Sequence, residues 1–199
     1  EFPKELQPKP AEVGFDLEAV LASVVGLRAE APEDAFTAQV LGTERSGNGV
    51  VIREDGLVLT IGYLITEAST VWLTTNAGVA VAGYPLAMDQ STGFGLVQAL
   101  GKLGAPALKR GSAKGVAPGD SVILAGHGGR GHALSAKILA KREFAGYWEY
   151  VLDEAIFTAP SHPNWGGTAL IGSKGELLGI GSLQLEASGG KDINMVVPI

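Results

Sequence analysis

The most informative stretch of the chain is Ser161-His162-Pro163-Asn164-Trp165-Gly166-Gly167, which is followed by Gly175-Glu176-Leu177-Leu178-Gly179-Ile180. Paired glycines indicate a tight turn, and the apolar run that follows each turn is typical of a strand. Trp165 stands at the centre of the first turn. An indole has no proton to give up and no lone pair with which to attack a carbonyl. The stretch therefore predicts strands joined by a turn that carries no nucleophile at its centre.

Glycine-punctuated apolar runs extend over the rest of the chain. The sequence has 199 residues, of which 46% are hydrophobic, 18% are charged and 29 are glycines. The glycines recur between short Val/Ile/Leu-rich runs, as expected for many strands joined by tight turns. A chain of this length buries one sizeable core or two small ones. The composition predicts an all-β fold.

Charge and cysteine content exclude several classes of function. The net charge is -6 and the sequence pI is about 5.1, so the chain has no electrostatic footprint for nucleic acid. It contains no cysteine, which excludes disulfides, a thiolate nucleophile and a Cys-ligated zinc site. No apolar stretch is long enough to span a bilayer, and residues 1–10 do not resemble a signal peptide. We therefore expect no nucleic-acid partner and no membrane span, and we expect any signal peptide to have been removed.

The pattern of apolar runs divides the chain into three parts. Residues 1–14 are expected to be an extended, mobile lead-in, and Asp16 is expected to cap a short helix that reaches Ala22. The join between two halves is placed in the Gly/Ala/Lys-rich stretch 101–115, which gives an N-terminal barrel over 15–105 and a C-terminal barrel over 106–199. The strands predicted in the first half are 24–29, 36–41, 49–52, 57–60, 71–75, 79–82 and 94–99. Those predicted in the second half are 121–125, 134–140, 147–151, 155–159, 168–171, 177–183 and 194–197.

Several of these segments, taken in order, resemble the protease domain of the HtrA/Deg branch of the trypsin-like (chymotrypsin-fold) serine proteases. The resemblance covers nearly the whole chain from Phe15 onward. It implies two six-stranded β-barrels with a short N-terminal helix, together forming one trypsin-like domain. The segments are Ala22-Ser23-Val24-Val25-Gly26-Leu27, Ser46-Gly47-Asn48-Gly49-Val50-Val51-Ile52, Asp55-Gly56-Leu57-Val58-Leu59-Thr60, Pro118-Gly119-Asp120-Ser121-Val122-Ile123-Leu124-Ala125-Gly126 and Val196-Val197-Pro198-Ile199.

The resemblance also identifies the positions at which the family carries its catalytic residues. Tyr63 stands where the family has the catalytic histidine, and Gly93 stands where it has the aspartate. The family's GNSGG is PNWGG here, so Trp165 stands at the serine position. Pro163 stands where a backbone N–H forms the oxyanion hole, and proline has no N–H to donate. The resemblance therefore implies a site that has lost its catalytic groups.

The histidine inventory supports the same interpretation. His127, His132 and His162 all lie in the second half, whereas the family's order requires a histidine in the first barrel. The resemblance thus implies a pseudoprotease, a catalytically inactive serine protease homologue that binds peptides or proteins. Two forms of this function are expected: binding within an oligomer, as a homo-trimer or hetero-assembly, and regulation of a related protease. By resemblance alone, the compartment is the cell envelope or periplasm, and peptide-binding PDZ modules commonly follow such a domain.

The residues expected to line the former substrate cleft share positions near the lost triad. In the family, the position of Ala159 and the strand around Ser182 line the specificity pocket, which would be apolar here. The indole of Trp165, together with Tyr63, is expected to fill the cleft; the alternative is a core side chain that follows a turn. The expected binding residues are Tyr63, Ala159, Asn164, Trp165, Gly166 and Ser182.

The sequence also leaves alternatives to a binding function. We interpret the histidines as solvated loop residues rather than as metal ligands, and we expect no metal and no cofactor. Ser161 and His162 are adjacent in sequence and are not expected to form a catalytic dyad. One alternative is an active serine-type endopeptidase or other hydrolase that uses unrecognised residues. A second is a structural assembly protein that contacts a fixed partner through the aromatic stretch 147–150.

Overall fold

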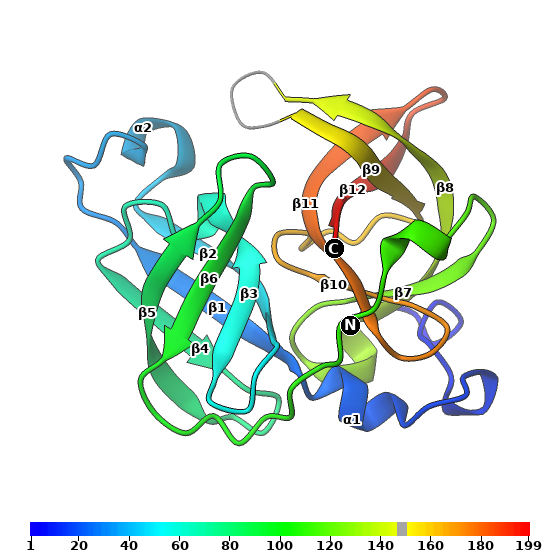
Figure 1. The fold of residues 1–199 in the computed structure, drawn as a ribbon, viewed down its shortest axis with the longest axis horizontal. Coiled ribbons are helices and arrows are strands. Elements are labelled where there is room, and N and C mark those ends of the chain that lie inside the picture. The colour runs from blue at the N-terminus through cyan, green and yellow to red at the C-terminus, as the bar shows by residue number, and fades with distance from the viewer. Residues whose placement is uncertain (147–150) are drawn as a thin grey trace.

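Alternating short strands close into two six-stranded barrels in a computed structural model that describes residues 1–146 and 151–199 (Figure 1). The first barrel has the strand order β1-β2-β3-β6-β5-β4 and the second has β10-β11-β12-β9-β8-β7. All twelve pairings are antiparallel. The predicted all-β, two-barrel fold is confirmed.

The strands of the first barrel are β1 (Val24–Glu30), β2 (Glu44–Val51), β3 (Leu57–Ile61), β4 (Thr70–Thr74), β5 (Ala80–Met88) and β6 (Phe94–Ala99). Those of the second are β7 (Ser121–Ala125), β8 (Ala133–Ala145), β9 (Val151–Ala159), β10 (Ala169–Ile171), β11 (Leu177–Ala187) and β12 (Lys191–Pro198). The helices are α1 (Leu17–Leu21) and α2 (Ala38–Leu41), with 3-10 turns η1 (Pro10–Glu12), η2 (Gly62–Leu64), η3 (Ala113–Gly115) and η4 (Gly129–His132).

Alternation along the strands fills each barrel with apolar side chains. In β6, buried Gly95, Val97 and Ala99 alternate with half-buried Phe94, Leu96 and Gln98. Short β10, which lies between β7 and β11, is buried along its whole length. Asp16 caps α1 as predicted, because its carboxylate accepts a hydrogen bond from the Ala19 amide at 3.1 Å.

The strand predicted over 36–41 is wrong. This segment forms a turn and the one-turn helix α2, and no strand of either barrel pairs with it. Its Val and Phe residues fit a strand by composition, but a strand also requires a free sheet edge. Both edges of β1 and β2 are already used within the closed barrel, so the segment remains outside it. The prediction over 147–151 lies outside the described residues except for Val151, which begins β9.

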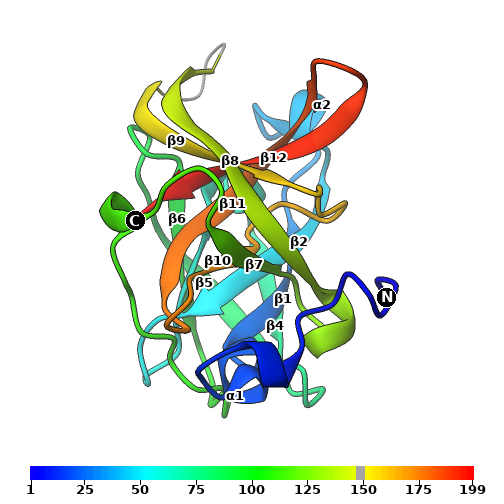
Figure 2. The ribbon, with the colours of Figure 1, turned by 90° about the vertical axis from the view of Figure 1, so that its right-hand side faces the viewer.

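The lead-in 1–14 differs from the extended, mobile segment that was expected. Phe2 N–H donates to Gly131 O at 2.8 Å, and Ser135 N–H donates to Leu6 O at 2.8 Å. Pro8 is buried, and η1 forms a short 3-10 turn. Figure 2 shows this segment running beside η4 and β8 of the second barrel. Backbone hydrogen bonds to two elements fix its course.

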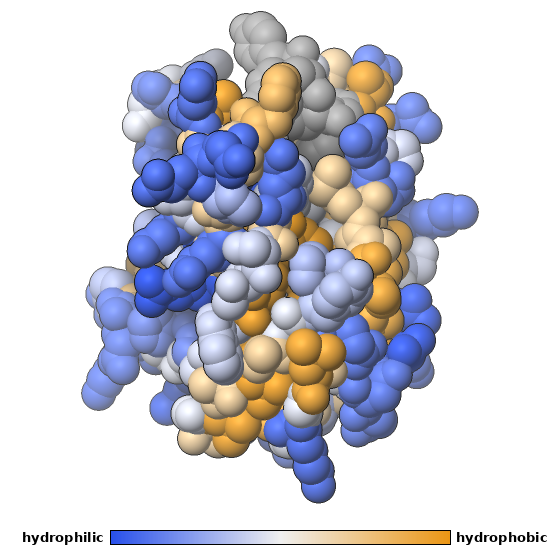
Figure 3. Space-filling model, turned by 90° about the vertical axis from the view of Figure 1, so that its left-hand side faces the viewer, coloured by the Kyte–Doolittle hydropathy of each residue, from blue (hydrophilic) through white to orange (hydrophobic). Residues whose placement is uncertain are grey.

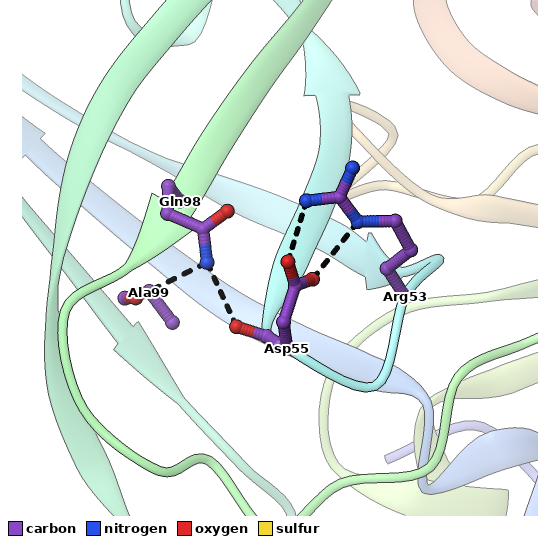
Figure 4. A network of polar contacts seen from close by, with 4 residues as sticks. All are labelled: Arg53, Asp55, Gln98 and Ala99. Atoms are coloured by element: carbon purple, nitrogen blue, oxygen red, sulfur yellow. Dashed lines mark hydrogen bonds and ion pairs between the residues drawn. The ribbon is translucent and has the colours of Figure 1, made fainter.

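The connection 100–120 joins the barrels and contains the boundary predicted at 105/106. Within this connection, Arg110 forms an isolated parallel bridge to Leu177 on β11. Across the β2–β3 turn, Arg53 and Asp55 form an exposed ion pair, and Gln98 Nε2 donates to Asp55 O at 2.8 Å (Figure 4). Within the described residues, no helix has the length and apolar character needed to cross a membrane.

Candidate functional site

The expected site residues come from three elements that meet where the barrels touch. Tyr63 lies on η2, directly after β3, and the turn 161–167 links β9 to β10. Ser182 lies on β11, within a register shift between Gly181 and Leu183. Tyr63 Oη donates a hydrogen bond to the Ser182 backbone oxygen at 2.8 Å. This bond joins the first barrel to the second across the predicted cleft.

The phenol of Tyr63 also lies against the Gly166 backbone. A Cβ added at Gly166 would lie 2.9 Å from Tyr63 Oη, so only glycine leaves room for the ring here. Gly47 of β2 approaches from the other side, where an added Cβ would lie 2.7 Å from Gly166 O. The structure therefore brings three of the expected binding residues, Tyr63, Gly166 and Ser182, into contact.

Asn48 on β2 is the polar centre of this contact, and its side chain is fully buried. Its Nδ2 donates to Asn164 O at 3.0 Å and to Gly166 O at 3.1 Å. Its Oδ1 accepts from the His127 amide at 2.8 Å. One amide side chain thus bonds backbone groups of two second-barrel loops, and Gly166 O also accepts from the Asn48 amide at 2.8 Å.

Gly93 lies close to η2 but has a backbone unsuited to an orienting acid. It accepts a 2.7 Å hydrogen bond from the Gly62 amide, and its φ is +83°. That left-handed region disfavours a residue with a Cβ. The nearby carboxylate of Asp89 instead accepts bonds from Ser91 and Thr92 of its own loop. These bonds, that from the Thr92 hydroxyl foremost, lower the pKa of the exposed Asp89 carboxyl.

The turn 163–165 offers no arrangement of the oxyanion-hole kind. Pro163 has no N–H, and the Asn164 amide donates to His162 Nδ1 at 3.1 Å. Trp165 O accepts from the Thr168 hydroxyl at 2.8 Å, and the Trp165 side chain is half-buried. Pro163 and Asn164 are exposed. The position two residues before Trp165 therefore has no N–H to donate, and the Asn164 amide is used within its own turn.

His162 is buried and serves the structure of this turn. Its Nδ1 accepts the Asn164 amide, so the proton of the neutral ring lies on Nε2, which donates to His132 O at 3.0 Å. Burial lowers the pKa of His162 below its usual value. The Phe2 ring contacts the imidazole edge-on, with centroids 4.9 Å apart. Both ring nitrogens are used by the backbone, so His162 is not available to Ser161 as a base.

The two walls of the expected specificity pocket are joined by hydrogen bonds. Ser161 Oγ on one wall donates to Gln184 Oε1 on the other at 3.0 Å. The fully buried Asn194 of β12 accepts from the His162 amide at 2.6 Å and contacts Leu183 O at 3.4 Å. Polar side chains therefore bridge the place where an apolar pocket was expected.

Ala159 is not part of this group of contacts. It is half-buried and lines, with Pro160, a groove of about 1020 Å³ that lies between residues 8–15 and strands β7 and β8. The sequence interpretation also missed two residues, Asn48 and Asn194. Each is an amide inside an otherwise apolar strand, and that contrast was the available signal.

Several polar groups of the site are engaged in contacts within the protein. Among residues 1–146 and 151–199, no cluster of three His, Asp or Glu side chains is placed to hold a metal ion. The Tyr63 hydroxyl, the Ser161 hydroxyl and the His162 imidazole are each engaged with another protein group. The seam is a network that ties two barrels together.

Comparison with known proteins agrees with this two-barrel geometry. A family model described as a trypsin-like peptidase domain matches residues 47–180. The chain belongs to the trypsin-like peptidase family. A search of curated proteins gave no match.

Solved structures of an HtrA-type protease and of the Rv3671c protease share this fold. The HtrA-type protease AlgW with a tripeptide superposes with a TM-score of 0.71 at 20% identity, covering 91% of this chain and 58% of that one. The active form of the Rv3671c protease from M. tuberculosis gives 0.73 at 22% identity, covering 96% and 83%. The inactive form of Rv3671c gives 0.71 at 20% identity, covering 96% and 91%. The chain thus spans under three fifths of the AlgW chain that it matches.

Proposed function

We propose that this trypsin-like domain is a pseudoprotease that acts by binding. The observation that carries the proposal is the combination at the seam: Tyr63, Gly93 and Trp165 occupy the three positions that the sequence identifies with the triad. Activation of a nucleophile requires a base within hydrogen-bond reach, and Tyr63 already donates its proton to Ser182 O. Pro163 adds the loss of an oxyanion donor, which typically costs about 2.7–4 kcal/mol of transition-state stabilisation.

A peptide is the partner that this scaffold accommodates best. AlgW structures contain a tripeptide and a decapeptide. We propose by analogy that this chain also binds an extended peptide. Both barrels are closed, so strand addition at an open barrel edge has little room. β11 offers a candidate edge, since it pairs with β10 only up to Ile180 and continues to Ala187. We propose that an extended peptide pairs with β11 beyond Gly181.

Tyr63 regulates this edge in our proposal. A peptide N–H that pairs with β11 at Ser182 competes with the Tyr63 hydroxyl for the same backbone oxygen. The internal bond therefore lowers peptide affinity. We further propose that the protein works in the cell envelope, in an oligomer or as a regulator of a related protease.

Proteolysis is the first test. We expect the purified chain to leave unfolded casein intact and to resist labelling by a fluorophosphonate, which reacts with activated serines. The matched control is Trp165→Ala, prepared identically. Hydrolysis by the parent but not by the control would overturn the proposal in favour of an active hydrolase.

Rebuilding the triad is the second test. Tyr63→His, Gly93→Asp and Trp165→Ser, combined in one protein, should still give no hydrolysis, because Gly93 has a φ of +83° and Pro163 lacks its N–H. Activity comparable to that of an HtrA-type protease would show that only the three side chains had been lost.

Peptide binding is the third test. Tyr63→Phe keeps the ring but removes the hydroxyl donor, so a fluorescein-labelled extended peptide library should bind severalfold more tightly to this variant. Fluorescence anisotropy measures the change. Equal affinity for the parent and Tyr63→Phe would remove Ser182 O from the binding edge.

A further inference from the structure

The loop between β1 and β2 presents two large apolar side chains to solvent. Phe36 is 93% exposed and Val40 is 70% exposed, and both lie on or next to α2 at one end of the first barrel (Figure 1). We call Phe36 and Val40 the knob. Scattered exposed apolar residues are common, so exposure alone carries no argument. The support beneath the knob distinguishes it.

The backbone of the knob is held from one side by Glu67. The Glu67 carboxylate accepts from the Phe36 amide at 3.0 Å, the Thr37 amide at 2.7 Å and the Thr37 hydroxyl at 2.6 Å. The bonds from Thr37 are the main reason that the pKa of Glu67 is lowered. Glu67 itself adopts a φ of +58°, which is unusual for a residue with a side chain.

Arg45 holds the knob from the other side, and its side chain is buried. Its Nη2 donates to the Thr37 hydroxyl at 2.9 Å and its Nε to Gly42 O at 3.1 Å. Its Nη1 donates to Tyr63 O and Thr66 O. Because the backbone beneath Phe36 is already fixed, binding a partner there costs little further backbone conformational entropy. Rigid, exposed aromatic residues of this kind are favoured as binding anchors.

The surroundings of the knob are acidic. Glu33, Asp34 and Glu67 are exposed within or beneath the loop, and exposed Glu44 begins β2 directly after it. Residues 15–99 contain ten Asp or Glu residues against three Arg and no Lys. Figure 3 shows hydrophobic residues on this side of the molecule in patches bordered by hydrophilic ones. A partner surface would have to combine an apolar hollow with positive charge.

The connection between the barrels has that combination. A hollow of about 640 Å³ is lined by Ile52, Ala107, Leu108, Lys109, Arg110 and Ile199. Residues 100–145 contain eight Lys or Arg against two Asp or Glu, the reverse of the first barrel. The backbone of the hollow is also fixed, since the Leu108 amide donates to Val51 O and the Leu177 amide to Lys109 O, both at 2.8 Å. Lys109 and Arg110 are exposed at its rim.

We infer that the knob of one copy docks into the Ala107–Gly111 hollow of a second copy of this chain. The phenyl ring of Phe36 packs in the hollow against Ile52 and Ile199, while Glu33 and Asp34 face Lys109 and Arg110. The C-terminal residue Ile199 lines the hollow, and Figure 1 shows the C-terminus away from α2, so the two surfaces of one copy do not meet. The contact is therefore head-to-tail, and a dimer formed by it leaves one knob and one hollow unoccupied.

Sedimentation velocity over a range of protein concentrations tests the contact. The parent should associate with rising concentration, and its association should weaken between 50 and 500 mM NaCl, values chosen to span strong and weak screening. Phe36→Asp and the double variant Lys109→Glu/Arg110→Glu should each weaken association by about tenfold or more. Leu100→Asp is the matched control, because Leu100 is 67% exposed on the same barrel but outside both surfaces.

Mixing the two blocked variants gives the decisive result. Phe36→Asp retains a hollow and Lys109→Glu/Arg110→Glu retains a knob, so an equimolar mixture should form 1:1 dimers and nothing larger. A mixture that stays monomeric overturns head-to-tail docking. A parent that is monomeric at every concentration also overturns it and leaves the knob to a different, basic protein. Circular dichroism of each variant verifies that the fold is retained.

Discussion

Two side chains of the same strand anchor two loops with opposite outcomes. Asn48, near the end of β2, bonds the turn 161–167, and Arg45, near its beginning, bonds the loop 36–42. Around Asn48, side chains and backbone groups bond one another across the barrel seam. Around Arg45, the loop 36–42 is hydrogen-bonded to the buried guanidinium, and the apolar side chains of Phe36 and Val40 remain exposed to solvent. A buried polar side chain can therefore hold a loop against the rest of the protein, as Asn48 does, or hold a loop so that its apolar side chains face solvent, as Arg45 does.

Removing Asn48 should have the largest effect on this pair of anchors. Asn48→Ala deletes a fully buried amide together with its bonds to Asn164 O, Gly166 O and the His127 amide, so we expect a loss of about 3–4 kcal/mol in unfolding free energy. Urea denaturation followed by circular dichroism measures it. Asn76→Ala is the matched control, because Asn76 also bonds two backbone groups but is exposed. Equal losses for both variants would mean that the seam is not specially dependent on Asn48.

Removing Arg45 should have the next largest effect. Arg45→Met keeps an apolar stem but deletes its hydrogen bonds to Gly42 O, Tyr63 O and the Thr37 hydroxyl, and we expect a loss of about 2–3 kcal/mol. Arg53→Met serves as the control, since the Arg53–Asp55 pair is exposed and should matter little (Figure 4). Hydrogen exchange should accelerate at Leu41 and Gly42 only in Arg45→Met. Unchanged exchange there would show that Arg45 does not anchor the loop.

Acid should loosen the closed turn and leave the presented loop in place. Burial lowers the folded-state pKa of His162, so the unfolded chain takes up a proton first as pH falls below the ordinary histidine value of 6.5. The contribution is complete above that pH and is lost as pH falls toward the folded-state pKa, by up to about 1.4 kcal/mol for each pH unit. Urea denaturation at pH 7.5 and 5.5 tests this. His162→Asn should remove part of the pH dependence; an identical slope would assign it to other groups.

Removing Glu67 should have the smallest global effect and a local one at the knob. Glu67→Ala deletes the acceptor of the Phe36 and Thr37 amides, and we expect these amides to exchange about tenfold faster while the unfolding midpoint changes little. Mass-spectrometric hydrogen exchange measures both loops together. Faster exchange at residues 162–166 in this variant would mean that the two loops are coupled through Tyr63.

Much of the fold was predictable, and the misses have definite causes. The strand limits of β6 and β7 follow from apolar runs bounded by glycine or polar residues. The segment 36–41 was assigned to a strand because Phe and Val favour strands, but strand formation also depends on a free neighbouring edge. Of the expected binding residues, Tyr63, Gly166 and Ser182 do meet, whereas Ala159 lies at a separate groove.

The sequence by itself determined the all-β class, the order of the two barrels and the residue types at the candidate site. These follow from local periodicity and from chemistry that no folding alters, such as the missing N–H of Pro163. Only the tertiary structure decided that Tyr63 bonds Ser182, that Asn48 closes the seam and that the knob stands in solvent. The first two contacts join residues more than a hundred positions apart, and their partners are set by barrel closure and packing rather than by any local pattern.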